Sequence, residues 1–446
     1  MEPKEEKREE EKQATTGEQE SNQKVASEEL FAEYLQSFRA RSEPERPQVE
    51  KRYKEMSGEH KFWDKQPVPK PQNLQEVPAG PMEKKKLDEV STEPTKLPEG
   101  FIWCGFDLNV EEELKEVYTM LTNNYVEDDE GYFRFDYSAE FLKWALMPPG
   151  YNPDLILGIR EAKTNRLVGF ITGQFVHLNI EGKKVRVTEV NFLCVIKSFR
   201  KYYMASILIR EVTRRSNVKG VWQGFYTSGT LLPTPFAEAR YYHRSLNPKK
   251  LLAANFSYKP EKQTMGIYTQ LNSLSEKPSF EFTGTLRRAE LKDLKQCKKL
   301  LENYLQKFKV HVEHTMDEFR HFFLPREKII ETFVIVDKDK VTDFISFYVL
   351  PSTILTEKCP YKLINAAYCY YFANTTLTVP QLFEIALIKA KELDFDVFNA
   401  LDIMDNAQAF EKLNFNPGDG FLKYYLFNWV LNQKLIHPSE LGATLV

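Results

Sequence analysis

The sequence predicts a mixed α/β fold that consists of two similar halves. Short helix and strand patterns recur along the chain at offsets of 174 to 179 residues, which indicates a duplicated α/β unit. The length of 446 residues and the apolar content of 42% are sufficient for a large core. The recurring pairs are the helix segments 121–125 and 300–304, the strands 168–171 and 343–346, the helix segments 208–210 and 387–389, and the strands 222–226 and 396–400.

The N-terminal region differs from the rest in composition. Ten of the first 12 residues are charged and no aromatic residue precedes Phe31, so residues 1–45 are predicted to form a mostly disordered charged tail. A short docking helix is expected within it at 28–39. Residues 46–100 are predicted to be an extended arm and linker because Pro67 and Pro69 favour an extended path. Phe62 and Trp63 are expected to anchor this arm.

From residue 101 the chain is predicted to be globular, with an N-terminal half at 101–275 and a C-terminal half at 276–446. The apolar pattern of 187–195 predicts a buried strand, and a helix pattern follows at 204–215. The basic segment 197–201 lies between them. A basic loop that leads into a helix N-terminus favours an anion, because free N–H groups and the helix dipole both attract negative charge.

Composition excludes several classes of function. The net charge of −3 argues against bulk binding of nucleic acid. Five scattered cysteines without CxxC spacing indicate a reducing compartment and no zinc site, and His311 with His314 lacks a second ligand pair. Because the sequence shows neither a signal peptide nor a run of about 18 apolar residues, a cytoplasmic protein without a transmembrane segment is expected.

The segment Glu189–Lys197 closely resembles a signature of the eukaryotic N-myristoyltransferases (glycylpeptide N-tetradecanoyltransferases). The resemblance extends over about 61–446 and is carried by further segments in the same order. They are Phe62-Trp63, 66–69, 124–129, 133–137, 208–211, 240–248, 350–353, 395–402 and 418–420. The chain is therefore identified as a divergent member of that family.

The resemblance implies a fold, a reaction and partners. Two tandem N-acetyltransferase-like halves related by pseudo-twofold symmetry are expected, with acyl-CoA bound by the first half and peptide mainly by the second. The implied enzyme is an N-acyltransferase that moves myristate from myristoyl-CoA, its co-substrate, to the N-terminal glycine of proteins or peptides. No permanently bound cofactor or metal is implied. A monomer, ribosome association and no direct contact with nucleic acid are also expected.

The family chemistry is a direct attack of the glycine amine on a thioester. The resemblance assigns the oxyanion donors to the main-chain N–H groups of Phe192 and Leu193, and such donors contribute about 3 to 4 kcal/mol each. It assigns the base to the terminal carboxylate of Val446. The end of the chain, 441–446, is apolar and uncharged, so a docked tail is expected rather than a frayed one.

The binding residues also follow from the resemblance. Those expected to bind acyl-CoA are His60, Lys61, Phe62, Trp63, Asn191, Phe192, Leu193, Cys194, Val195, Arg200, Lys201, Tyr202, Tyr203, Met204 and Ala205. Those expected to bind the peptide are Tyr125, Asp128, Asp129, Phe133, Arg134, Thr227, Gly229, Tyr241, His243, Phe256, Ser352, Tyr368, Asn399 and Asp419. Without the resemblance, the acidic cluster 127–130 would be read as a solvated loop and His243 as a core histidine.

The sequence departs from the family pattern at several of these sites. Tyr202 and Tyr203 replace a Lys and an Arg, and Ile196 replaces a His. Asn414 and Asn416 replace a Lys and a Gly. These changes leave two alternatives open. One is a weakened paralogue that binds acyl-CoA or lipidated peptide, and the other is an acyltransferase with a different chain length or acceptor.

Overall fold

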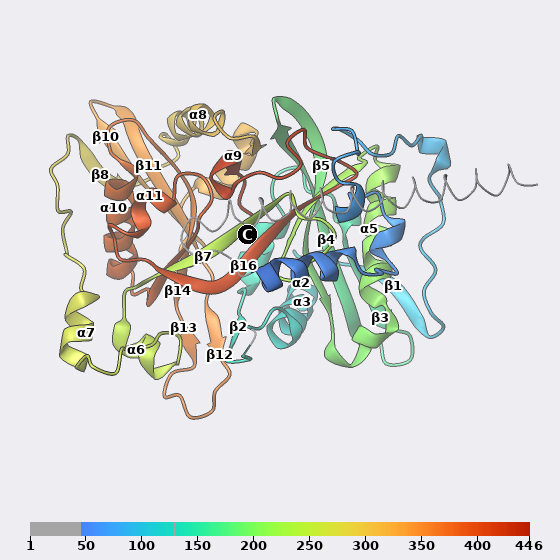
Figure 1. Ribbon diagram of the computed structural model, residues 1–446, viewed down its shortest axis with the longest axis horizontal. Helices are drawn as coiled ribbons and strands as arrows, with labels where there is room; N and C mark the ends of the chain where they lie inside the picture. Colours follow the sequence, from blue (N-terminus) through green and yellow to red (C-terminus); the bar gives the residue numbers. More distant parts are fainter. Residues whose placement is uncertain (1–45, 129) are drawn as a thin grey trace, which may run out of the picture. The chain divides into compact units, whose positions relative to one another are not determined.

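The structure is a computed structural model that describes residues 46–128 and 130–446 (Figure 1). It divides into two compact units. The larger unit contains 86–222, 240–421 and Ser439–Val446, and the smaller unit contains 46–85, 223–239 and 422–438. The predicted tail and the helix expected at 28–39 lie outside the described residues.

The first half of the larger unit is an antiparallel sheet in the order β1-β3-β4-β5. The long hairpin of β4 and β5 turns at Glu181 and Gly182, which both have positive φ, as a tight hairpin turn requires. The helices α3 and α5 pack on β4 and β5. The elements are β1 (Phe101–Gly105), α3 (Glu111–Asn124), α4 (Ala139–Leu146), β3 (Ile156–Glu161), β4 (Leu167–Ile180), β5 (Lys183–Val195) and α5 (Met204–Val218).

The second half repeats this arrangement. Its antiparallel sheet has the order β8-β10-β11-β14, and the helices α8 and α10 pack on β11 and β14. The elements are β8 (Thr285–Arg288), α8 (Leu294–Leu305), α9 (Met316–Phe323), β10 (Ile330–Asp337), β11 (Lys340–Val349), β14 (Ala366–Asn374) and α10 (Val379–Glu392). The repeat predicted from the sequence is thereby confirmed, since both halves have the same element types in the same order.

Shorter elements complete the larger unit. A small sheet contains β2, β12 and β13. In the main sheet, β14 pairs in parallel with β15, and β15 pairs antiparallel with β7. The bounds are β2 (Phe133–Phe135), β7 (Ala237–Ser245), α6 (Pro248–Ala253), α7 (Met265–Leu271), β9 (Val310–Glu313), β12 (Ser352–Ile354), β13 (Leu363–Ile364), β15 (Val397–Leu401), α11 (Ala407–Phe410), β16 (Asn416–Phe427) and β17 (Leu441–Gly442). β16 continues into the smaller unit.

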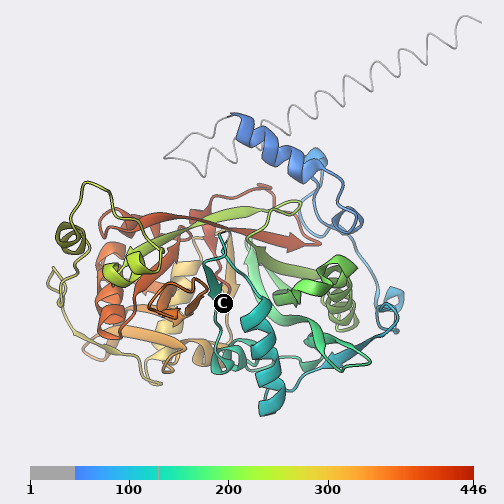
Figure 2. The ribbon, with the colours of Figure 1, turned by 90° about the horizontal axis from the view of Figure 1, so that it is seen from below.

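The end of the chain packs inside the larger unit, where the short strand β17 lies just before the buried residues 443–445. β17 pairs with β9 in parallel, and β9 pairs with β4 of the first half. A Cβ atom on Gly442 would lie 2.9 Å from Phe308 and 3.0 Å from His311, so a close approach of chains requires glycine here. Figures 1 and 2 both place the C-terminus between the green elements of the first half and the orange-to-red elements of the second. The docked tail expected from the sequence is confirmed.

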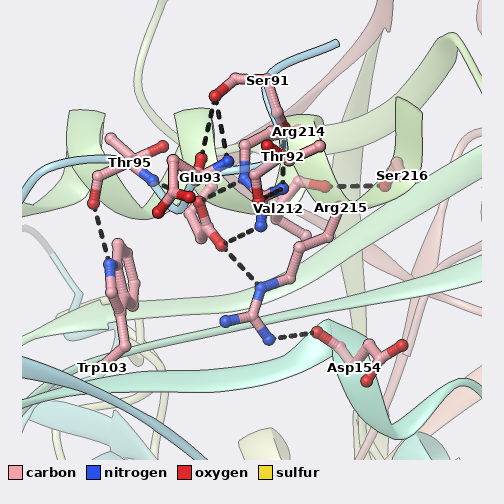
Figure 3. A network of polar contacts seen from close by, with 11 residues as sticks. Ser91, Thr92, Glu93, Thr95, Trp103, Asp154, Val212, Arg214, Arg215 and Ser216 are labelled. Carbon is pink, nitrogen blue, oxygen red and sulfur yellow. Dashed lines mark hydrogen bonds and ion pairs between the residues drawn. The ribbon is translucent and has the colours of Figure 1, made fainter. Parts of the chain in front are cut away.

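A buried ion cluster fixes helix α5 to the segment that precedes β1. Glu211 is fully buried and accepts hydrogen bonds from Arg214 at 2.8 Å, Arg215 at 2.8 Å and the main-chain N–H of Thr95 at 2.8 Å (Figure 3). Trp103 then donates to the carbonyl of Thr95 at 2.9 Å. Burial acts to raise the pKa of Glu211, but these hydrogen bonds outweigh it and lower the pKa to about 2.

The smaller unit contains the N-terminal arm. Trp63 stacks on Tyr226 of β6 (Gln223–Ser228), with ring centroids 5.7 Å apart, and Tyr226 stacks on Tyr425 at 5.0 Å. Arg52 bonds the buried carboxylate of Glu238 at 2.6 Å. The sequence predicts an extended arm and linker for 46–100, but the arm is not extended throughout. It begins with helix α2 (Arg46–Ser57), because Val49, Tyr53 and Met56 follow helical spacing and the prolines that enforce an extended path come later.

Candidate active site

The strand β5 contains a β-bulge at the residues predicted to hold the oxyanion. The pairing with β4 passes from Thr172–Asn191 directly to Phe170–Cys194, so Phe192 and Leu193 both oppose the single residue Ile171. Phe192 has φ of 55°, a left-handed conformation that costs a non-glycine residue about 1 to 3 kcal/mol. A bulge removes main-chain groups from the strand ladder and redirects them. These two amides are therefore arranged differently from those of a regular strand.

The Phe192 amide faces a tyrosine. Burial raises the pKa of the Tyr125 hydroxyl, and the main-chain N–H of Phe192 opposes that rise because it stabilises the phenolate. The two rings are stacked with centroids 5.8 Å apart. An oxygen atom can thus approach this amide, which is the property that an oxyanion donor needs.

Cys194 follows the bulge but cannot serve as a nucleophile. Its side chain is buried, and burial raises the pKa of the thiol to about 12. The thiolate is the reactive form of cysteine, so Cys194 is inert at neutral pH. Neighbouring Val195 is also buried. The strand therefore offers main-chain chemistry rather than covalent catalysis.

The basic loop after β5 forms a 3₁₀ turn, Lys197–Tyr202, that leads into α5. Arg200 donates to the main-chain carbonyls of Val195 at 3.1 Å and Asn124 at 2.9 Å, so its guanidinium shapes the loop. Lys201 lies 5.3 Å from the ring of Tyr202, and both side chains are exposed. Lys201 is therefore the cation of this turn that remains most open to an anion.

The first residues of α5 complete this segment. Tyr203 is 66% exposed, and its left-handed backbone, with φ of 58°, starts the helix without a side-chain cap. Met204 is buried and Ala205 is half-buried. The uncapped helix start keeps main-chain N–H groups available for a ligand, as the sequence pattern predicts.

Several of the predicted peptide residues lie in an aromatic cluster of the larger unit that consists of two groups of neighbouring rings, and the strands β2 and β7 contribute to both groups. Neighbouring ring centroids within the groups lie 5.1 to 6.4 Å apart. Ser352 joins the same region because it pairs with Phe135 between β12 and β2. The rings belong to Tyr125, Phe133, Phe135, Tyr137, Phe192, Tyr241, His243, Phe256 and Tyr368.

His243 occupies the polar end of this cluster. Its Nδ1 lies 2.6 Å from Oδ1 of Asn399, and burial lowers its pKa. The negative charge of Asp419 acts in the opposite direction and raises the pKa of His243. A Cβ atom on Gly418 would fall 2.2 Å from Nε2 of His243, so only glycine fits at this position. His243 is therefore held neutral and fixed.

The acidic segment is partly satisfied within the chain. Glu127 accepts from Arg134 at 2.5 Å and Lys197 at 2.8 Å, and these two hydrogen bonds lower its pKa. Asp128 accepts from the main-chain N–H of Phe133 at 2.6 Å. Asp129 lies outside the described residues. Arg134 is thus bonded to Glu127, so its side chain organises this segment.

Six predicted residues belong to the smaller unit. His60, Lys61 and Phe62 precede the short turn that starts at Trp63, and Asp64 closes this turn by accepting from the main-chain N–H of His60 at 2.7 Å. Thr227 lies on β6 opposite Tyr424, and the carbonyl of Gly229 accepts from Lys423 at 2.8 Å. The sequence correctly indicated that Phe62 and Trp63 join an arm to a folded body.

Sequence reasoning missed a polar cavity inside the larger unit. The cavity measures about 40 Å³, and the residues that line it include Glu189, His314, Tyr371 and Val446. Glu189 interrupts a mostly apolar strand pattern, and that interruption is the signal that could have drawn attention to it. The predicted base, Val446, therefore shares a cavity with a second acidic residue.

None of the helices in the described part of the chain combines the length and hydropathy needed to cross a bilayer. No group of three or more His, Cys, Asp or Glu side chains in 46–128 and 130–446 is placed to hold a metal ion.

Comparisons with known proteins agree with this geometry. The family model of the N-terminal domain of myristoyl-CoA:protein N-myristoyltransferase matches residues 81–239, and that of the C-terminal domain matches residues 253–444. The glycylpeptide N-tetradecanoyltransferase of Dictyostelium discoideum is 44% identical over 390 residues, which cover 87% of this chain and 92% of the relative. Glycylpeptide N-tetradecanoyltransferase 2 of Danio rerio is 45% identical over 389 residues, which cover 86% and 77% respectively.

A solved structure gives the same result. The crystal structure of Saccharomyces cerevisiae N-myristoyltransferase with bound myristoyl-CoA superposes with a TM-score of 0.81 and 35% identity, covering 87% of this chain and all of that chain. The resemblance seen in the sequence and the mixed α/β fold are both confirmed. The chain belongs to the N-myristoyltransferase family, whose members are N-acyltransferases.

Proposed function

We propose that the protein transfers myristate from myristoyl-CoA to the N-terminal glycine of proteins. The observation that carries this proposal is the bulge at Phe192 and Leu193, which sets two main-chain amides apart from the ladder of β5. The docked chain end supports it, because Val446 lies in the same compact unit. Relatives that match most of the chain are named for this reaction.

The amides of Phe192 and Leu193 serve as the oxyanion hole. When the glycine amine attacks the thioester carbon, negative charge develops on the carbonyl oxygen. Donors that are already in place stabilise this charge more than they stabilise the ground state, and each contributes about 3 to 4 kcal/mol. Because the donors belong to the main chain, they do not depend on the identity of the side chains.

The terminal carboxylate of Val446 serves as the base. A glycine ammonium has a pKa of about 8, so it must lose a proton before it can attack. The new N–C bond forms, the C–S bond breaks, and the coenzyme A sulfur leaves. Of the two ammonium protons lost, one goes to the base and one ends on the thiol.

The acyl-CoA and peptide sites follow the same assignment. The helix start at Tyr203 to Ala205 and the exposed Lys201 are proposed to bind the phosphates. The cluster around Tyr241, His243 and Tyr368 is proposed to hold the first peptide residues. Ribosome association, a monomeric state and a cytoplasmic location remain predictions from the sequence.

A turnover assay tests this function. The protein is incubated with myristoyl-CoA and a peptide that begins with glycine, and the acylated peptide is measured by mass spectrometry. A peptide of the same sequence with an acetylated N-terminus is the matched control. We expect acylation of the free peptide alone. Tight binding of myristoyl-CoA without acylated product would contradict the proposal and favour a binding module instead.

A further inference from the structure

The cavity that contains Val446 also contains a carboxylate that the proposed mechanism does not use. Residues from both halves of the larger unit line the cavity, including Gln174 of β4, Glu189 of β5 and Tyr371 of β14. Its volume of about 40 Å³ has room for about three water molecules, since one needs roughly 10 to 15 Å³. A polar cavity of this size can conduct a proton between its walls.

Glu189 is an acidic group of this cavity that forms no salt bridge with another described residue. It accepts one hydrogen bond, from Nδ2 of Asn191 at 2.8 Å. Part of its surface remains accessible, and it lies among the residues that line the cavity. Burial raises the pKa of Glu189 to about 7, while the hydrogen bond from Asn191 acts in the opposite direction. This carboxyl can therefore take up and release a proton near neutral pH.

Two other acidic side chains of the cavity have partners within the chain. Glu313 forms an ion pair with Lys184 at 2.8 Å and accepts from Asn179 at 3.2 Å, which keeps it ionised and lowers its pKa. Glu318 accepts from the main-chain N–H of Thr315 at 2.6 Å as part of a helix cap. The ion pair with Lys184 therefore holds the carboxylate of Glu313 in its ionised form.

Neutral polar groups surround Glu189 on the remaining sides. His314 is half-buried, its Nε2 is buried without a hydrogen-bond partner among the described residues, and desolvation of the ring lowers its pKa to about 4. Burial raises the pKa of Tyr370 and Tyr371, and the charge of Glu189 adds to this rise. The hydroxyl of Tyr371 also accepts from the main-chain N–H of Thr444 at 3.0 Å. Tyr371 thus touches the docked chain end and lies within the field of Glu189.

From this arrangement we propose that Glu189 relays the proton of the reaction. It receives, through water in the cavity, the proton that the glycine ammonium gives to the terminal carboxylate of Val446. This inference rests on the proposed function and extends it.

The relay conserves atoms and charge. The ammonium gives one proton to the carboxylate of Val446, which passes it to the ionised Glu189. The amine then forms the amide bond, and the leaving sulfur takes the second proton. Glu189 later releases its proton to solvent, so each turnover releases one proton overall. Glu189 acts through Val446 and is therefore a positioning residue for the proton rather than a catalytic residue.

The Glu189→Gln variant tests the relay, because it keeps the shape and removes the ionisation. The single-turnover rate of myristoyl transfer is measured from pH 6 to pH 9 with the enzyme saturated with myristoyl-CoA. We expect the wild-type rate to rise through an ionisation near pH 7 and a second one near the pKa of the glycine amine. In Glu189→Gln the first ionisation should disappear and the rate at pH 7.5 should fall about 10- to 100-fold.

Two further variants separate the relay from a structural role. Glu313→Gln removes a carboxylate from the same cavity, and it should leave the ionisation near pH 7 unchanged. Glu189→Asp keeps an ionisable group, and it should restore a pH-dependent rate. Myristoyl-CoA affinity should be the same in wild type and Glu189→Gln, with circular dichroism confirming the fold.

Each outcome decides the proposal. An unchanged pH profile in Glu189→Gln overturns the relay, and so does an equal loss of acyl-CoA affinity, which would show a structural role. If the wild-type protein forms no acylated peptide, the proposed function itself fails and the relay fails with it. If the wild type transfers myristate and only the expected pH dependence is absent, the relay alone is wrong.

Discussion

The two halves of the larger unit share a backbone design but use it differently. In the first half, the bulge of β5 at Phe192 and Leu193 faces Ile171 of β4. In the second half, β14 skips Tyr370 and Tyr371 in the same way, opposite Ser346 of β11. Ser346 donates to the carbonyl of Tyr371 at 2.9 Å and accepts from its N–H at 3.4 Å. A hydroxyl on the paired strand therefore bonds the second bulge, whereas Ile171 offers no polar side-chain atom to the first, where the amide of Phe192 faces the hydroxyl of Tyr125.

The loops that precede the helices show the same contrast. In the second half, the buried carboxylate of Asp343 accepts from the main-chain N–H groups of Thr375, Thr376 and Leu377 at 2.9 to 3.0 Å. The corresponding residue of the first half is Val168, whose side chain cannot accept a hydrogen bond. In the second half, the carboxylate of Asp343 thus binds the main-chain N–H groups before the helix. In the first half, we propose that a phosphate of coenzyme A binds the corresponding N–H groups.

A duplicated fold can thus keep a main-chain binding site in one half while side chains occupy the corresponding main-chain groups in the other. A main-chain site needs no particular side chain to work, but one polar side chain is enough to block it. Apolar residues at 168 and 171 therefore keep the first half open. Substitutions that add a polar group to the first half, remove one from the second half or destabilise one half alone test this difference.

The largest effect is expected when the first bulge is filled. In Ile171→Thr, a hydroxyl can bond the bulge amides as Ser346 does in the second half. The loss of one oxyanion donor lowers the transfer rate about 100- to 1,000-fold. Single-turnover kinetics with myristoyl-CoA and a glycine peptide measures this loss. Ile171→Val is the matched control and should retain most activity, and equal rates in the two variants would contradict the prediction.

A slightly smaller effect, on stability, is expected at the buried carboxylate of α5. Glu211 corresponds to Ala390 of α10, so the first half depends on an ion cluster where the second has plain apolar packing. The folded-state pKa of Glu211 is lowered to about 2 from 4.5. Such a group contributes stability above about pH 4.5, and this stability is lost as the pH falls through 2. The shift corresponds to about 3 kcal/mol.

Urea unfolding of Glu211→Gln at pH 7 and pH 3 measures this contribution. The variant should be about 3 kcal/mol less stable than wild type at pH 7, and the difference should shrink at pH 3. Glu99→Gln, at an exposed site, is the control and should change stability little. A difference that does not depend on pH would show that packing rather than charge matters at Glu211.

An intermediate effect, on coenzyme A affinity, is expected when Val168 is replaced by the aspartate found at the corresponding position of the second half. Val168→Asp places an acid next to the proposed phosphate site, where it competes for the same N–H groups. Because hydrogen bonds to charged groups contribute about 1.5 to 3 kcal/mol, coenzyme A should bind about 10- to 100-fold more weakly. Calorimetric titration measures the affinity, and Val168→Thr is the uncharged control. Equal affinities in the two variants would place the phosphates elsewhere.

The smallest effect is expected when the second bulge is emptied. Ser346→Ala leaves the buried N–H of Tyr371 without its partner, which costs about 1 to 3 kcal/mol of unfolding free energy. Myristoyl transfer should fall far less than in Ile171→Thr, since the second bulge carries no donor for the reaction. Chemical unfolding and the same kinetic assay measure the two quantities. Ser346→Thr keeps the hydroxyl and should remain close to wild type.

Several features of the site could be predicted from the sequence because they depend on local patterns. The apolar tail 441–446 indicated docking, since a frayed terminus would be charged or polar. The sequence also indicated that a basic loop leads into the start of α5, since loop and helix are adjacent in the chain, and the anion site there stays a prediction. Resemblance to the family located Phe192 and Leu193 within a strand. The bulge itself could not be predicted, because a left-handed phenylalanine has no local sequence signal and is held in place by the pairing around it.

The sequence by itself determined the two-half α/β design, the docked chain end and the family. These follow from periodicity, composition and ordered motifs, which are properties of neighbouring residues. Only the tertiary structure decided that Ser346 and Asp343 close the second half, and that Glu189, His314 and Val446 line one cavity. The physical reason is that hydrogen bonding and burial depend on groups brought together from distant parts of the chain. The sequence names those groups, but folding sets their environment.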